Sequence, residues 1–215
     1  MLVKERMSRP VIALPPDMPV YDARNLFRQE QIRRAPVVKK GKLIGIVSRQ
    51  DLVDASPTKA TSLSRWEINY LLSKLTVSEI MTKTVTTIDE DTPIEQAARI
   101  MADEKIGGLP VMRDGKVAGM ITETDLFKVF LEMMGAREVG VRVTALVDDQ
   151  PGILQKITNA VADVGGSFIS FGQFTGEDVA TKLITFKVAG AKEEDVKKAI
   201  WDIAKEVWDI RECCH

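Results

Sequence analysis

The chain has 215 residues, of which 45% are hydrophobic and 28% are charged, as in ordinary globular domains. Its 30 basic residues balance 31 acidic ones, which argues against a broad nucleic-acid-binding face, and no run of about 18 apolar residues could cross a membrane. We therefore expect neither nucleic acid nor a membrane as a partner. The two cysteines, Cys213 and Cys214, are adjacent and cannot cross-link a core through a disulfide bond. This favours a reducing, cytoplasmic location.

Two stretches of the sequence follow one pattern. GIVSRQDL begins at Gly45, and GMITETDL begins at Gly119, 74 positions later. The same offset holds without a gap over about fifty residues, so the chain contains two copies of one unit. Each copy predicts a short extended stretch, a helix (residues 21–30 or 95–104), a hairpin and a second helix. Pairs that match at this offset include Val3 and Val77, Met7 and Met81, Asp17 and Asp91, and Pro36 and Pro110.

Each quoted stretch places a hydroxyl where a strand gives way to a helix. Ser48 and Thr122 hold this position, and Asp51 and Asp125 follow three residues later. The start of a helix binds phosphate readily, and a carboxylate can accept hydrogen bonds from the two hydroxyls of a ribose. The pattern therefore fits a nucleotide site. The same spacing is also close to a capping box, which only starts a helix, and the two roles are compatible.

The two copies differ beside these junctions. Arg33 and Arg34 in the first copy occupy the positions of Gly107 and Gly108 in the second. Arginines there could reach a polyphosphate, whereas glycines allow a ligand or a backbone to approach closely. The arginines could equally be a solvated pair. We expect two unequal sites.

A helix is predicted in the linker between the copies, residues 57–76. Ser64 and Glu67 have the spacing of a capping box, and Leu63 with Ile68 that of a hydrophobic staple around it. Apolar residues then recur on one helical face, which favours packing against the repeat core. The alternative is that this helix contacts a partner, because Trp66 and Tyr70 are residue types that suit interfaces. The apolar face comprises Ile68, Leu71, Leu72 and Leu75.

From residue 139 the pattern changes to strand, helix, two strands, helix and strand. The turn that contains Asp149 and Gly152 opens the first helix, and residues 193–205 predict the second. The order βαββαβ is that of the ferredoxin-like split unit. The predicted fold class is therefore α+β.

The repeated motifs resemble the CBS domain. The first copy shows Ala35-Pro36-Val37 and Ser48 with Asp51-Leu52; the second shows Leu109-Pro110-Val111 and Thr122 with Asp125-Leu126. The resemblance implies a tandem CBS pair, a Bateman module, with CBS domain 1 at residues 1–56 and CBS domain 2 at residues 77–135. It implies binding of AMP, ADP, ATP or S-adenosylmethionine as a regulatory ligand. The implied nucleotide-binding residues are Ser48, Asp51, Thr122, Asp125, Val11, Val85, Arg34, Pro36, Gly108 and Pro110.

Residues 139–215 resemble an ACT domain through the stretch LVDDQPGIL, which begins at Leu146. In that family the loop after strand one and the start of strand two hold an amino acid at an interface between domains. Many members that bind amino acids have Asn entering strand two, where this chain has Ser167, so dimerisation without a ligand is an open alternative. The implied ligand-binding residues are Asp149, Gly152, Ile153, Leu154 and Ser167.

The sequence predicts a regulatory protein and not an enzyme. The only histidine is His215, the last residue, so histidine catalysis and histidine-rich metal sites are not expected, and neither is a catalytic cofactor. A CBS pair joined to an ACT domain resembles the acetoin-utilisation (AcuB-type) proteins, which implies a homodimer or higher homo-oligomer and an effector enzyme of carbon metabolism as partner. The alternative is a structural scaffold with vestigial ligand sites.

Overall fold

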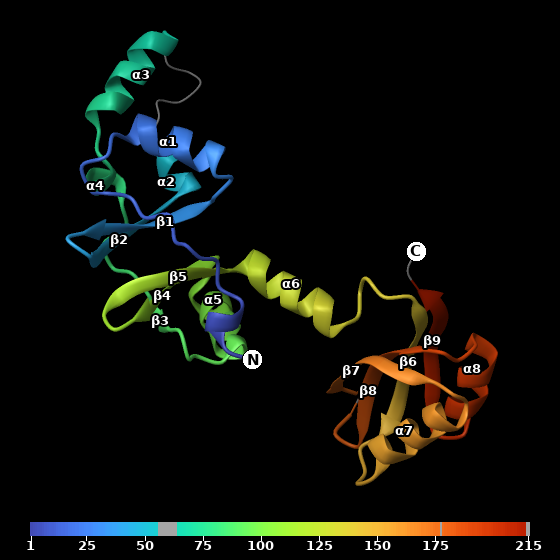
Figure 1. Ribbon diagram of the computed structural model, residues 1–215. Helices are drawn as coiled ribbons and strands as arrows, with labels where there is room; N and C mark the ends of the chain where they lie inside the picture. The colour runs from blue at the N-terminus through green and yellow to red at the C-terminus, as the bar shows by residue number, and fades with distance from the viewer. Residues whose placement is uncertain (56–63, 177, 214–215) are drawn as a thin grey trace. The chain divides into compact units, whose positions relative to one another are not determined.

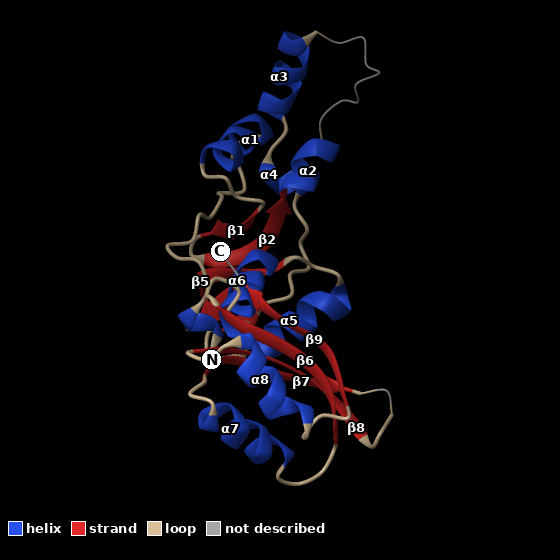
Figure 2. Ribbon diagram, turned by 90° about the vertical axis from the view of Figure 1, so that its right-hand side faces the viewer, coloured by secondary structure: helices blue, strands red, loops and turns tan. Residues whose placement is uncertain are grey.

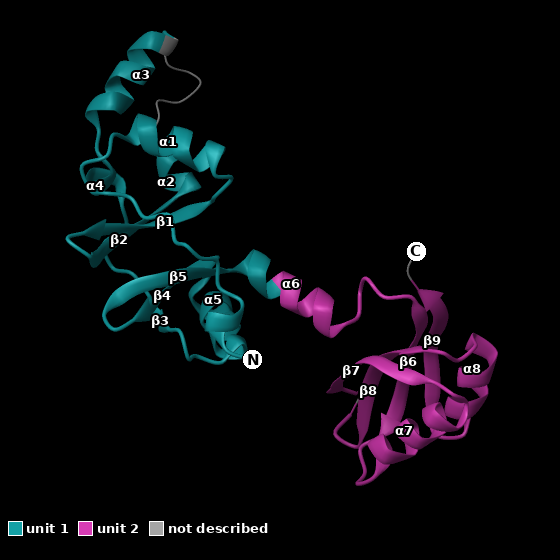
Figure 3. Cartoon of the chain, in the orientation of Figure 1, with its two compact units in different colours: residues 1–126 teal, residues 127–215 magenta. Residues whose placement is uncertain are grey.

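The computed structural model describes residues 1–55, 64–176 and 178–213. The chain divides into two compact units, residues 1–126 and 127–215 (Figure 3). The first unit holds the first copy and the second copy up to residue 126. Its elements are η1 (Val3–Glu5), α1 (Val20–Gln29), β1 (Arg34–Lys39), β2 (Lys42–Ser48), α2 (Arg49–Asp54), α3 (Arg65–Lys74), α4 (Val77–Ile80), β3 (Ile88–Asp89), α5 (Ile94–Glu104), β4 (Gly108–Arg113), β5 (Lys116–Thr122) and the start of α6 (Glu123–Met133).

The two copies fold alike, as the constant offset predicted. Each contains an antiparallel hairpin, β1–β2 or β4–β5, with the same register and a bulge at the same place. Figure 2 shows α1, α2 and α4 on one side of the first hairpin. The predicted extended stretch before the first helix of each copy is a strand only in the second, where β3 pairs in parallel with β4. In the first copy it is reduced to a single bridge between Leu14 and Val37.

The first turn of each copy packs into the core of the other copy. Val3 and Met7 belong to the second copy's core cluster with Val111 and Ile121. Val77 belongs to the first copy's core cluster. Backbone bonds follow the same exchange, because Val3 N–H donates to Thr92 O at 2.9 Å. Neither copy therefore completes its core from its own contiguous sequence.

The glycine that opens each quoted stretch is explained by this exchange. A Cβ on Gly119 would overlap the Met7 side chain, and a Cβ on Gly45 would overlap the Met81 side chain. Next to these methionines, Ser8 exchanges two backbone hydrogen bonds with Met120, at 2.8 and 3.2 Å. The glycines leave room for the partner copy's methionine.

Helix α3 lies in the linker, and its start confirms the predicted capping box. Glu67 N–H donates to Ser64 Oγ at 3.3 Å, and Ser64 N–H donates to Glu67 Oε2 at 2.8 Å. Leu72 is buried in the first copy's core, as expected, but Leu71 is 47% exposed, so its assignment to the packed face was wrong. Leu63, the expected staple partner, lies outside the described residues.

The second unit has the predicted βαββαβ order. After the end of α6 it contains β6 (Gly140–Asp148), α7 (Ile153–Asp163), β7 (Ser167–Thr175), β8 (Thr181–Ala189), α8 (Glu193–Trp201) and β9 (Glu206–Cys213). The strands lie in the order β7-β8-β6-β9, and α7 and α8 pack on one face (Figure 1). Helix α8 ends at Trp201, four residues before the predicted end, because Lys205 N–H already bonds Leu146 O at 2.8 Å beside the last strand.

A buried lysine ties the segment after α6 to this sheet. Lys187 of β8 is 3% exposed, and its Nζ donates to Gly135 O and to Glu138 O, each at 2.9 Å. Gly135 has φ +56°, the left-handed conformation in which a glycine commonly follows the end of a helix. Two backbone carbonyls in the segment that follows α6 are thus satisfied by a side chain of the second unit's own sheet.

Candidate ligand sites

The two strand-to-helix junctions, residues 48–51 and residues 122–125, are the centre of the candidate site. In the first junction, Ser48 N–H donates to Asp51 Oδ2 at 2.7 Å and Asp51 N–H donates to Ser48 Oγ at 3.2 Å. In the second, Thr122 N–H and Oγ1–H both donate to Asp125 Oδ2, at 3.0 and 2.7 Å. The capping interpretation is therefore correct at the first junction, and a variant of it holds at the second.

At the first junction, capping leaves the carboxylate of Asp51 able to do more. The bond from Ser48 N–H uses one of its oxygens, Oδ2, whereas a carboxylate has about four lone-pair sites on two oxygens. Asp51 is half-buried, and Asp125 is 6% exposed. The hydrogen bonds fix the rotamer of each aspartate beside the first turn of a helix. Such a fixed acceptor is suited to bind the hydroxyls of a ribose.

The structure brings part of the predicted nucleotide set to these junctions. Strand register places Arg34 opposite Ser48 and Gly108 opposite Thr122. Pro36 and Pro110 lie two residues further along the same strands, and both are buried.

The two valines lie in the segments that cross between the copies. Val11 lies between Ser8, which pairs with the second hairpin, and Leu14, which pairs with the first. Val85 lies in the equivalent segment after Thr82, and both valines are half-buried.

Arg34 reaches the other copy. Its Nη1 and Nη2 would lie 2.6 and 2.5 Å from a Cβ on Gly107, and Glu123 Oε2 would lie 2.6 Å from the same point. The guanidinium therefore belongs to the surroundings of the second junction, although Arg34 itself pairs with Ser48 of the first. Sequence reasoning missed Glu123. The offset could have found it, because Glu123 replaces Arg49 of the first copy.

The predicted amino-acid site of the second unit is split between two ends of the sheet. Asp149 lies beside Ala180, to which its N–H donates at 2.8 Å, and its carboxylate pairs with Lys182 Nζ at 3.2 Å. Ser167 pairs with Ala189, nine residues further along β8. At about 3.4 Å a residue, this separation is roughly 30 Å. One small ligand cannot touch both within a chain, so Ser167 does not join the other predicted residues.

Three predicted residues do lie together at the start of α7. Gly152 is the N-cap residue with φ +84°, Ile153 is half-buried, and Leu154 is 48% exposed. This end of the helix offers backbone N–H groups for a carboxylate.

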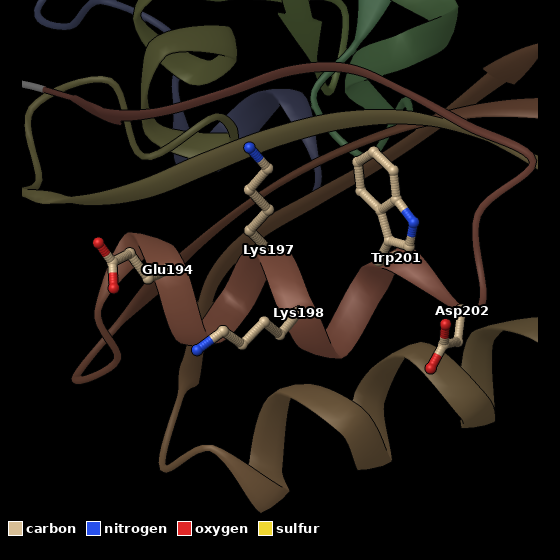
Figure 4. A pocket seen from close by; sticks show the side chains of 5 residues that line it. All are labelled: Glu194, Lys197, Lys198, Trp201 and Asp202. Atoms are coloured by element: carbon tan, nitrogen blue, oxygen red, sulfur yellow. The ribbon is translucent and has the colours of Figure 1, made fainter.

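A hollow of about 520 Å³ lies on α8, apart from all predicted residues. In Figure 4, Lys197 and Trp201 rise from one side of α8, while Lys198 and Asp202 lie toward α7. The described residues that line the hollow all belong to α8 or to the residue that follows it. Among the residues that the structure describes, no group of three or more His, Cys, Asp or Glu could hold a metal ion, and no helix is long and apolar enough to cross a membrane.

The fold and the two related junctions place the chain in the class of tandem-repeat proteins, with two equivalent small α+β repeats. The particular family follows from a match over both copies, at residues 3–58 and 77–132, to the CBS domain. The chain belongs to the CBS domain family. The match confirms the predicted tandem CBS pair.

Solved structures agree with this assignment. The CBS domain pair of protein MJ0100, in complex with 5′-methylthioadenosine and S-adenosyl-L-methionine, is 31% identical, with a TM-score of 0.51; the match covers 60% of this chain and 95% of that one. An acetoin utilization protein (AcuB) from Vibrio cholerae is 29% identical, with a TM-score of 0.52, over 64% of this chain and 98% of that one.

Curated relatives share the pair in different settings. The L-aspartate semialdehyde sulfurtransferase of Methanocaldococcus jannaschii is 31% identical over 131 residues, which are 60% of this chain and 23% of that protein. A CBS domain-containing protein of Dictyostelium discoideum is 30% identical over 62% of this chain and 93% of its own length. The chain spans 23% and 47% of the first two curated relatives it matches, so the activity of those whole proteins does not carry over.

Proposed function

We propose that the CBS pair is a non-catalytic regulatory module that binds an adenosine ligand at one or both junctions. The observation that carries this is the duplicated hydroxyl-x-x-Asp, held at both junctions by hydrogen bonds of 2.7–3.2 Å. An oriented carboxylate beside a helix start suits a ribose and the group attached to it. The ligands of the MJ0100 pair, both adenosine derivatives, support the same class of ligand here.

We infer further that the second unit is an ACT domain. Its support is the βαββαβ order, the strand order β7-β8-β6-β9 and the loop that carries Asp149 and Gly152. Because Ser167 lies at the far end of the sheet, an amino-acid site that uses all the predicted residues needs a second chain, which fits a homodimer. β7 and β9 are the edge strands through which such sheets can pair. The proposed partner is an effector enzyme of carbon metabolism, of the acetoin-utilisation type.

Isothermal titration calorimetry tests the nucleotide proposal. AMP, ADP, ATP and S-adenosylmethionine are titrated into the ligand-free full chain and into Asp51→Asn and Asp125→Asn. Asparagine keeps a capping acceptor but loses the charge that binds ribose, so we expect at least tenfold weaker binding at the altered site. Asp54→Asn is the matched control, since Asp54 is exposed and its carboxylate accepts from Gln50 Nε2 of the same helix at 2.6 Å. No binding of any of the four ligands would exclude the sensor.

A scaffold with vestigial sites is the second candidate. It is favoured by exposed apolar side chains on one stretch of α6, where Phe127 is 66%, Phe130 55% and Met133 65% exposed. Such a stretch suits a contact with another chain. Light scattering on the ligand-free chain tests this candidate by measuring its molar mass. A scaffold requires a stable oligomer without ligand, so a monomeric mass would exclude the scaffold.

A further inference from the structure

The two junctions of the CBS pair carry opposite charges at equivalent positions. At the first, Arg49 N–H donates to Arg33 O at 2.8 Å; at the second, Glu123 N–H donates to Gly107 O at 3.3 Å. The two hydrogen bonds are equivalent, because the donors are 74 positions apart in the sequence and so are the acceptors. The first junction is therefore flanked by two arginines, and the second by a glutamate and a glycine.

Arg34 adds a positive charge beside the second junction. Its guanidinium lies beside Gly107, next to the Glu123 carboxylate, in the space that a side chain at Gly107 would fill. The second junction thus has one cation and one anion near its opening. Arg33 and Arg49 are exposed, and neither forms an ion pair in the part of the chain that the structure describes. Their charges remain available to a ligand at the first junction.

We propose that the two sites divide adenosine ligands by charge. The first site, residues 48–51, takes a phosphorylated adenosine, because guanidinium groups bind phosphate oxygens in charge-assisted pairs. The second site, residues 122–125, takes an adenosine derivative without phosphate whose 5′ substituent is neutral or cationic. Glu123 repels phosphate there and attracts a sulfonium or ammonium group, while Arg34 accommodates a carboxylate. This assignment rests on the proposed function of the CBS pair.

S-Adenosylmethionine has the features that the second site requires. Its 5′ substituent carries a sulfonium, an ammonium and a carboxylate, which match the adjacent Glu123 and Arg34. ATP presents several negative charges at the same place and fits the arginines of the first site. The two ligands are therefore the sharpest pair of probes, and 5′-methylthioadenosine is the neutral reference.

The test exchanges the charges at equivalent positions. Arg49→Glu should weaken ATP binding by about tenfold and leave S-adenosylmethionine binding within about twofold, and the effect should shrink at high salt. Glu123→Arg should weaken S-adenosylmethionine by a similar factor and let the second site accept ATP, which raises the ATP stoichiometry from one to two per chain. Lys42→Glu is the control, because it changes net charge equally at the opposite end of β2 from Ser48.

Site assignment comes from the aspartates. Asp51→Asn should weaken ATP binding at least tenfold and leave S-adenosylmethionine binding intact, and Asp125→Asn should do the reverse. Competition of the two ligands for one site, or loss of ATP binding only in Asp125→Asn, would overturn the charge assignment and leave the nucleotide proposal standing. Failure of every adenosine ligand to bind the unaltered chain would overturn both.

Discussion

Replacing Gly119 by alanine adds a methyl group where Met7 of the other copy already lies. The new Cβ would lie 3.0 Å from Met7 Cγ and 3.0 Å from the Ser8 carbonyl oxygen. The thioether can move, but the carbonyl is held by Met120 N–H at 3.2 Å. Overpacking of this kind costs about 1–3 kcal/mol of the free energy of unfolding.

Removing the methionine should also destabilise the chain, for the opposite reason. Met7 is 7% exposed and belongs to the second copy's core, so Met7→Ala leaves a cavity worth about 2–3 kcal/mol. In the double variant the new methyl group enters part of that cavity. The two changes should therefore be non-additive, and the double variant should be about 1–2 kcal/mol more stable than the sum of the single effects predicts.

Urea denaturation of the full chain, followed by far-ultraviolet circular dichroism, measures all four members of this cycle. The equivalent cycle at Gly45 and Met81 should give the same sign, because a Cβ on Gly45 meets Met81. Met133→Ala is the control: this methionine is 65% exposed, and its loss should change stability by less than about 0.5 kcal/mol. Additive effects at both glycines would refute the exchange of first turns.

Three further predictions concern other parts of the chain. Lys187→Met leaves two backbone carbonyls without their charged donor, so it should cost roughly 2 kcal/mol and speed hydrogen exchange in residues 134–139. Leu72→Ala should cost about 2–4 kcal/mol in urea denaturation, whereas Trp66→Ala, at a residue 74% exposed, should cost less than about 0.5. The hydrogen bond from Arg211 lowers the pKa of Asp209, so this carboxylate stabilises the fold above about pH 4 and the contribution is lost as pH falls; the thermal-stability deficit of Asp209→Asn should disappear in acid.

Much of the fold could be predicted because local patterns determine it. The offset of the repeat predicted two equivalent hairpins, and Asp-Gly at Asp114 marks a tight turn that the structure places between β4 and β5. Ser64 and Glu67 predicted the start of α3 within one residue. Helical spacing of apolar residues and turn residues predicted the βαββαβ order of the second unit. Each of these signals acts over a few residues.

The exchange between copies could not be predicted for a physical reason. Val3 and Val77 occupy equivalent positions in two similar units, so each satisfies the core of either copy and the sequence does not say which it joins. The reach of Arg34 to Gly107 depends on the same exchange. The separation of Ser167 from Asp149 depends on the antiparallel register of β7 and β8, which a motif does not contain.

The exchange also bears on how the two sites act together. Ile46 exchanges both of its backbone hydrogen bonds with Thr82 of the other copy, at 2.9 Å each, and Ser48 follows two residues later. Thus each candidate ligand junction is positioned by a strand that forms backbone hydrogen bonds with the other copy. A ligand that binds only the folded state at 100 times its dissociation constant adds about 2.7 kcal/mol of stability. Because neither core closes without the other copy, this stabilisation belongs to the whole pair and not to one repeat. Occupancy of either site should therefore raise the stability of both copies together, even where the two sites select ligands of opposite charge.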